Sequence, residues 1–172
     1  DTMRLYEMFI GDFEQSAPWN TQSIKGCKRF LERFYNLLDM AEGSGITPEL
    51  EKHIHKLIKK VTGDIDSMKF NTAIAAMMSA VNTVYEIGRI NKSELGILTK
   101  LLSPFAPHIA EELWEALGHG ESISYAAFPE YVEAYTVENN CTYAVSFNGK
   151  TRFTVELPVD MGKEDVDAHV RS

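Results

Sequence analysis

The sequence has few cysteines and no long apolar run, and both scarcities narrow what the protein can be. Its 172 residues include two cysteines, Cys27 and Cys141, which lie far apart in unlike contexts. Two thiols cannot supply the four ligands of a structural zinc site, and they do not make a disulfide framework. No apolar run approaches the ~20 residues of a membrane span, and we expect no secretory leader. We therefore expect a cytoplasmic protein without membrane contact.

Positive charge is also scarce, and it is unevenly placed. The formal net charge of −8 argues against a globally basic nucleic-acid-binding protein. Residues 21–69 nevertheless carry a net charge of +2, whereas residues 70–149 carry −6. A contact with a polyanion is therefore expected only in the first of these two stretches.

Signatures of catalysis are missing as well. The sequence has no phosphate-binding glycine loop and no recognisable Ser/His/Asp or Cys/His set. His53 and His55 are ~200° apart around a helix, so they cannot share a metal ion. We expect His53 to be a partly buried spacer and His55 to lie on the basic side. His108 with Glu111 or Glu112 is a weak alternative metal or catalytic site, because acidic groups near a helix start are explained by the helix dipole.

Most of the chain has the apolar spacing of amphipathic helices, with buried positions recurring every three or four residues. The pair Thr47-Pro48 is a strong helix start, and the proline in SPFAP interrupts a later helix. We expect helices over five stretches: 21–40, 48–68, 71–88, 93–102 and 107–118. After about residue 120 the period changes to two, which predicts strands on either side of Asn148-Gly149.

These patterns predict a mainly α protein with a small second module. We expect an antiparallel helical bundle over 1–120, a linker over 121–138, and the truncated start of an α+β module with a β-hairpin over 139–172. Two strands and one helix enclose little core, so we expect further sequence beyond Ser172.

The hairpin presents a choice of register. A two-residue loop of Asn148 and Gly149 would place apolar and cationic side chains on one face, which a half-buried sheet disfavours. We therefore expect a three-residue loop, 147–149, with a bulge at Gly149. Lys150 and Arg152 would then lie together on the exposed face, where they could contact a phosphate.

Two consecutive helices have cationic outer faces opposite their apolar stripes. One such face is ordinarily a solvated surface, but two in an otherwise acidic chain indicate contact with a polyanion. The cations are Lys25, Arg29 and Arg33 on the first helix and Lys52, Lys56, Lys59 and Lys60 on the second.

Several blocks of the sequence resemble one family. The stretch LLSPFAPHIAEELWEALG (101–118) resembles the C-terminal helical region of class I aminoacyl-tRNA synthetases for Leu, Ile, Val and Met. Four more blocks resemble the bacterial leucyl-tRNA synthetase family: RLYEMF (4–9), IKGCKRFLERFY (24–35), HKLIKKVTGDI (55–65) and FNTAIAAMM (70–78). The stretch AVSFNGKTRFTVELPVD (144–160) is similar to the start of that family's C-terminal domain. The blocks occur in the family's order over nearly the whole chain.

The resemblance implies an anticodon-binding-type bundle that docks tRNA, in this case tRNA(Leu), through its phosphate backbone. Such contacts position the tRNA without reading its sequence. Arg29 and Arg33 match family arginines in the R-F-L-x-R block, whereas the other cations are chosen by helix face or strand position.

The resemblance also implies a parent enzyme, a leucine–tRNA ligase that uses ATP and Mg²⁺ and whose other domains would contact this one. The HIGH and KMSKS signatures of that family are not in this sequence. We therefore expect no catalysis, cofactor or metal in this stretch itself. Two alternatives stay open: a helical scaffold or protein-interaction module, and the equivalent domain of an Ile, Val or Met synthetase.

Overall fold

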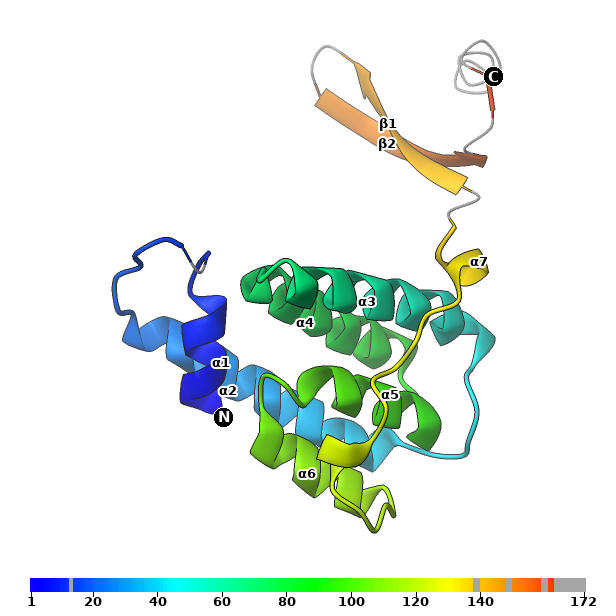
Figure 1. Ribbon diagram of the computed structural model, residues 1–172. Coiled ribbons are helices and arrows are strands. Elements are labelled where there is room, and N and C mark those ends of the chain that lie inside the picture. Colours follow the sequence, from blue (N-terminus) through cyan, green and yellow to red (C-terminus); the bar gives the residue numbers. More distant parts are fainter. Residues whose placement is uncertain (13, 138–139, 148–149, 159–160, 163–172) are drawn as a thin grey trace. The chain divides into compact units, whose positions relative to one another are not determined.

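The computed structural model describes residues 1–12, 14–137, 140–147, 150–158 and 161–162 (Figure 1). Its elements are α1 (Thr2–Phe9), α2 (Thr21–Tyr35), η1 (Asn36–Met40), α3 (Pro48–Asp66), α4 (Phe70–Ile87), α5 (Lys92–Leu102), α6 (Pro107–Ala116), η2 (Ile123–Tyr125), α7 (Glu133–Thr136), β1 (Asn140–Phe147) and β2 (Lys150–Pro158). The chain is mainly helical, as the sequence predicts. It divides into two units, Asp1–Thr136 and Val137–Ser172, so residues 121–136 of the predicted linker belong to the first unit.

Local signals in the sequence set where the helices begin and end. The side chain of Asn20 accepts hydrogen bonds from two backbone N–H groups in the first turn of α2. Pro48 occupies the first turn of α3. Asn91 and Glu94 form a reciprocal capping box at the start of α5. Gly88 ends α4 with a φ of 78°, a left-handed conformation that favours glycine.

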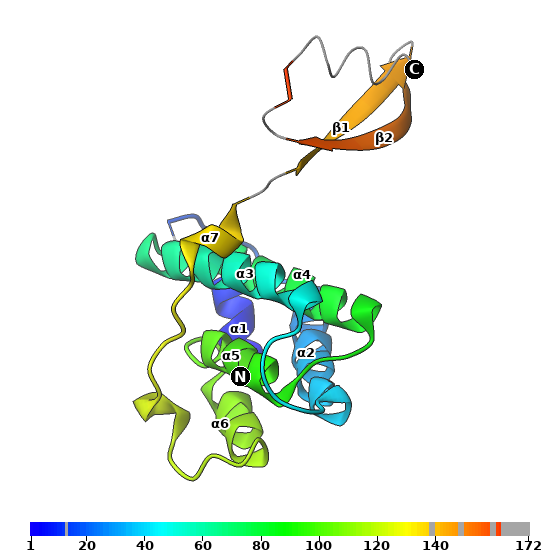
Figure 2. The same ribbon diagram turned by 90° about the vertical axis from the view of Figure 1, so that its right-hand side faces the viewer.

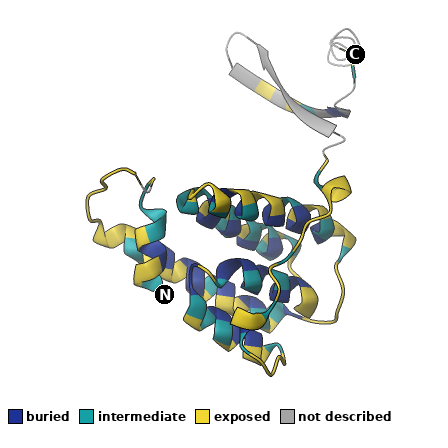
Figure 3. Ribbon diagram, viewed as in Figure 1, coloured by how far each residue is buried: buried dark blue, intermediate teal, exposed yellow. Residues whose placement is uncertain are grey.

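The core of the first unit lies between the helices (Figure 3), and α3 packs along α4 in both views of the ribbon (Figures 1 and 2). The predicted apolar spacing is confirmed, because the stripes of α2 and α3 are buried. Their buried apolar residues are Cys27, Phe30, Leu31 and Phe34 on α2 and Leu50, Ile54, Leu57, Ile58 and Val61 on α3. Cys27 is a free thiol, and burial raises its pKa, which keeps it protonated and unreactive.

Two carboxylates connect helices that are distant in the sequence. Asp1 Oδ2 accepts a hydrogen bond from the backbone N–H of Ile109 at 2.7 Å, so the start of α1 caps α6. Glu94 Oε1 accepts from the backbone N–H of Thr47 at 2.6 Å and from its hydroxyl at 2.9 Å. Glu94 Oε2 accepts from the N–H of Asn91 at 2.6 Å. One fully buried carboxylate thus joins the starts of α3 and α5.

In the second unit β1 and β2 form an antiparallel hairpin, but its predicted register is wrong. Phe147 pairs directly with Lys150, which leaves a two-residue connection in place of the three-residue loop. The register shifts between Val145 and Ser146, so Arg152 is taken up as an extra residue within the strand. Farther from the turn Val145 therefore lies opposite Phe153. The bulge removes the pairing of Val145 with Arg152, whereas Phe147 still lies opposite Lys150, so Lys150 and Arg152 do not form the predicted pair.

Candidate nucleic-acid interface

The outer face of α2 offers two cations to a partner. Lys25 and Arg29 are exposed and one helical turn apart. Neither forms an ion pair within the part of the chain that the structure describes. Lys28 is also exposed, but its ammonium lies 3.7 Å from the carboxylate of Glu32. The positive charges of Lys25 and Arg29 are therefore exposed to the solvent and are not neutralised by a neighbouring carboxylate among the described residues.

Arg33, the third predicted cation of α2, is half-buried and contacts α4. Its guanidinium donates a hydrogen bond to Asn82 Oδ1 at 2.8 Å and lies 4.6 Å from the centre of the Tyr85 ring. The hydroxyl of Tyr85 in turn donates to the backbone carbonyl of Arg33 at 3.0 Å. These contacts join α2 to α4, so part of the hydrogen-bonding capacity of the Arg33 guanidinium is used within the chain.

The four predicted lysines of α3 are not equivalent. Lys52 is exposed, and Lys56 is half-buried. Lys59 Nζ lies 2.6 Å from Glu133 Oε1, and Lys60 Nζ lies 2.6 Å from Asp64 Oδ2. These two lysines are therefore partly neutralised by the chain itself. The sequence could not show the first pairing, because Glu133 is 74 residues away.

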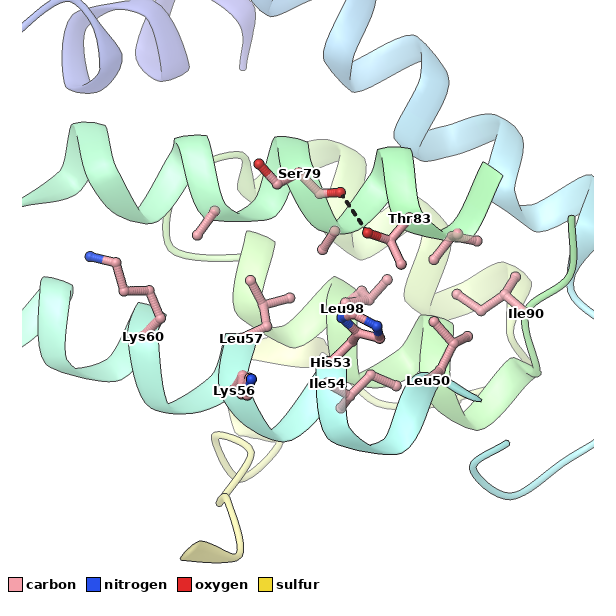
Figure 4. A pocket seen from close by; sticks show the side chains of 13 residues that line it. Leu50, His53, Ile54, Lys56, Leu57, Lys60, Ser79, Thr83, Ile90 and Leu98 are labelled. Carbon is pink, nitrogen blue, oxygen red and sulfur yellow. Dashed lines mark hydrogen bonds between the residues drawn. The ribbon is translucent and has the colours of Figure 1, made fainter. Parts of the chain in front are cut away.

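A groove of about 240 Å³ lies between α3 and α4 (Figure 4). Its floor is apolar, whereas polar and cationic side chains from both helices lie around it. The polar lining residues are His53, Lys56 and Lys60 from α3 and Ser79 and Thr83 from α4. An apolar floor does not suit a phosphate, so we expect an anion to contact the lysines at the edge rather than enter the groove.

The roles predicted for His53 and His55 are reversed in the structure. His53 is exposed, whereas only 8% of His55 is exposed. The N–H of Val132 donates to His55 Nδ1 at 3.1 Å, and the Tyr135 ring stacks on the imidazole. Helical periodicity cannot predict this burial, because the covering residues lie about 77 positions later in the chain.

His108 and Glu111, the weak metal or catalytic candidates, each make a separate structural contact. His108 Nδ1 lies 2.8 Å from Asp1 Oδ1. The carboxylate of Glu111 accepts hydrogen bonds from the hydroxyl of Ser122 and from the N–H of Ile123, the latter at 3.0 Å. Among the described residues, no group of three or more His, Cys, Asp or Glu side chains could hold a metal ion.

We predict that the contacts of Glu111 with Ser122 and Ile123 are lost in acid. The hydrogen bonds from Ser122 and Ile123 hold the pKa of Glu111 below its usual range. Since the folded pKa is the lower one, the attachment is complete above the ordinary glutamate pKa and is lost as the pH falls through the folded value. The amide chemical shift of Ile123 should therefore titrate at a pH below the ordinary pKa of a glutamate.

Glu111→Gln should abolish this titration of Ile123, whereas Glu115→Gln, an exposed change on the same helix, should preserve it. NMR spectra recorded from pH 7 to pH 3 would measure both variants. An unchanged titration of Ile123 in Glu111→Gln would show that another group controls this segment.

The charges of α2 and α3 contrast with those of the following sequence. No lysine or arginine occurs from residue 101 to residue 149. Exposed glutamates in this stretch include Glu112, Glu115 and Glu121. A polyanion is therefore attracted toward α2 and α3 and repelled by α6 and the segment that follows it. No helix in the described part of the chain is long and apolar enough to cross a membrane.

Arg152, in the second unit, is exposed, and the side chain of Lys150 lies outside the described part of the structure. Arg89, which is not among the predicted contacts, is exposed but lies 2.8 Å from Glu49. Among the predicted contacts, the most available are thus Lys25 and Arg29 on α2 and Lys52 on α3.

Comparison with known proteins identifies the family of the chain. The family model of the anticodon-binding domain of tRNA ligase matches residues 48–166. The leucine–tRNA ligase of Porphyromonas gingivalis is 51% identical and aligns with 97% of this chain and 19% of its own length. That of Alkaliphilus oremlandii is 44% identical and aligns with 100% of this chain and 22% of its own length. The chain therefore spans about a fifth of the length of these relatives.

A solved structure is also similar. It is the ternary complex of an Agrobacterium radiobacter K84 LeuRS with tRNA and LeuAMS, with a TM-score of 0.74 and 29% identity. The match covers 99% of this chain and 24% of that one. The predicted resemblance to leucyl-tRNA synthetases is confirmed by these relatives, and the chain belongs to the family of anticodon-binding domains of tRNA ligases.

Proposed function

We propose that this chain is the tRNA-docking part of a leucine–tRNA ligase. It holds tRNA, here tRNA(Leu), by the phosphate backbone, so that the acceptor end reaches a catalytic site elsewhere in the parent enzyme. On this proposal, aminoacylation with ATP and Mg²⁺ takes place in the rest of the parent enzyme, which makes up about four fifths of its length. The parent enzyme acts in the cytoplasm. One observation supports it most strongly: unpaired cations are exposed on α2 in a chain of net charge −8.

We order the candidate contacts by their exposure and by the ion pairs that they form. Lys25, Arg29 and Lys52 come first because they are exposed and form no ion pair within the described residues. Lys56 follows, because it borders the groove between α3 and α4. Arg33, Lys59 and Lys60 come last, because each is already held by a partner within the chain.

A salt titration tests the proposal. We expect the chain to bind a tRNA(Leu) transcript with an affinity that falls linearly on a log–log plot against salt. Three or four phosphate contacts correspond to a slope of roughly −3, because each contact contributes about −0.9. Fluorescence anisotropy from 30 to 300 mM KCl would measure it. Undetectable binding at the lowest salt, or an affinity independent of salt, would contradict the proposal.

Phosphate contacts also predict how well the chain distinguishes one tRNA from another. Lysine and arginine contacts to phosphates carry no sequence information, so a tRNA for another amino acid should bind this chain with similar affinity. A strong preference for tRNA(Leu) would show that bases are read as well.

The alternative function, a protein-interaction module, has some support from the segment after α6. Large apolar side chains there remain exposed, among them Tyr125 and Phe128. We assign them to contacts with other domains of the parent protein, which is compatible with tRNA docking through α2 and α3.

A further inference from the structure

After α6 the chain returns to α3 before it enters the second unit. In Figures 1 and 2 the yellow segment runs from η2 to α7, and α7 packs against α3. Residues 131–135 are all exposed to solvent on their outer side. We name residues 131–136 the latch, and two side chains of α3 hold it.

The first anchor is His55. Its Nδ1 accepts the backbone N–H of Val132 at 3.1 Å, so in this contact Nδ1 carries no proton and the neutral ring bears its proton on Nε2. The Tyr135 ring stacks on the imidazole, with 5.0 Å between centroids and an interplanar angle of 18°. One histidine thus binds both the backbone and an aromatic side chain of the latch.

The second anchor is Lys59, one helical turn after His55 on the same face of α3. Its ammonium lies 2.6 Å from Glu133 Oε1 and 5.6 Å from the centre of the Tyr131 ring. The hydrogen bond between the two charged groups raises the pKa of Lys59 and lowers that of Glu133. The two anchors together contact four of the six latch residues.

The latch has little structure of its own. Its helix α7 has four residues, one turn, which is far below the ~12 residues that an isolated helix needs in water. The backbone bond from the N–H of Tyr135 to the carbonyl of Val132 lies within the latch itself. The conformation of the latch therefore depends on the side chains of α3.

We propose that the latch docks on α3 and undocks from it as one unit while the helical bundle stays folded. Exposed side chains, few backbone hydrogen bonds and dependence on two anchors are the features of a segment that opens locally. Undocking lengthens the tether of the second unit, because residues after about Phe128 become free. Eight released residues have a root-mean-square span of about 15 Å. This inference does not depend on tRNA binding.

Hydrogen exchange on the full chain tests the latch. The variant His55→Phe keeps a ring for Tyr135 and removes the acceptor, and Glu133→Gln keeps the size of the side chain and removes its charge. We expect the double variant to speed exchange of the Tyr135 amide, which bonds to the carbonyl of Val132 within the latch, at least tenfold. Amides of Leu57 and Val81, in the cores of α3 and α4, should exchange as before.

The matched control is Glu130→Gln, which removes the same charge from an exposed residue just before the latch. It should leave exchange at 131–136 unchanged. The proposal is overturned if the double variant exchanges like the original chain, since the anchors then hold nothing. It is also overturned if Leu57 and Val81 lose protection to the same extent, because the latch would then belong to the cooperative core.

The proposed lengthening of the tether is tested by a separate measurement. NMR relaxation of the amides in β1 and β2 should report faster and more independent tumbling of the second unit in the double variant than in Glu130→Gln. Equal relaxation in the two variants would overturn the lengthening of the tether.

Discussion

Replacing Lys25 and Arg29 together by glutamate is expected to weaken tRNA binding by the chain about 100-fold at low salt. Each substitution removes a charge-assisted phosphate contact of about 1.5 kcal/mol, and the sum of about 3 kcal/mol corresponds to that factor. Stability should change by less than about 0.5 kcal/mol, because both side chains are exposed and form no ion pair within the described residues. Fluorescence anisotropy and thermal unfolding would measure the two effects.

The control is Lys92→Glu, which reverses one exposed charge at the start of α5, outside the two basic helices. It should reduce the affinity less than Arg29→Glu alone. The pair Arg29→Glu with Lys56→Glu extends the test to α3 and should also weaken binding. If Lys25→Glu with Arg29→Glu binds tRNA as the original chain does, α2 is not the docking surface. A collapse of the melting temperature would show that the two cations are structural.

Glu94→Ala is expected to lower the free energy of unfolding by about 3 kcal/mol, which corresponds to a fall of roughly 10 °C in melting temperature. Glu94 is fully buried, and its carboxylate accepts three hydrogen bonds from Thr47 and Asn91. Its removal leaves those donors without a partner and deletes the capping box of α5. Urea unfolding followed by circular dichroism would measure the loss.

Two further variants separate the causes. Glu94→Gln keeps the size and one acceptor oxygen, so it should be intermediate between the original chain and Glu94→Ala. Glu115→Ala removes an exposed glutamate from α6 and should stay within about 0.5 kcal/mol of the original stability. Equal stabilities of Glu94→Ala and Glu115→Ala would mean that the buried carboxylate does not join α3 and α5.

The helices of this protein could be predicted from short stretches of sequence. Asn20 accepts hydrogen bonds from the first turn of α2, Pro48 fits the first turn of α3, and Gly88 adopts the left-handed conformation that ends α4, so each acts within one turn. The apolar stripes identify the buried faces for the same reason, since the helical period alone fixes which side chains share a face. The predicted helix over 21–40 nevertheless becomes a 3₁₀ turn after Tyr35.

The candidate site was only partly accessible to the same reasoning. The sequence identified α2 and α3 as the basic helices, and Lys25 and Arg29 are exposed as expected. It could not show that Arg33 binds Asn82, 49 residues away, or that Lys59 binds Glu133. Whether a cation is available to bind a phosphate depends on the neighbours that folding brings to it. The face of the helix on which it lies depends only on its spacing in the sequence.

The sequence by itself thus determined the helices α2 to α6, most of their buried faces and the family, because these depend on hydrogen bonds and spacing within a few residues. Tertiary structure alone decided the burial of His55 beneath the latch and the pairing of Phe147 with Lys150. The covering segment is distant in sequence, and the register was set by a bulge at Arg152 that places Val145 opposite Phe153. Both outcomes depend on which apolar and charged groups come into contact after folding. The periodicity of apolar residues along one helix or strand does not specify those contacts.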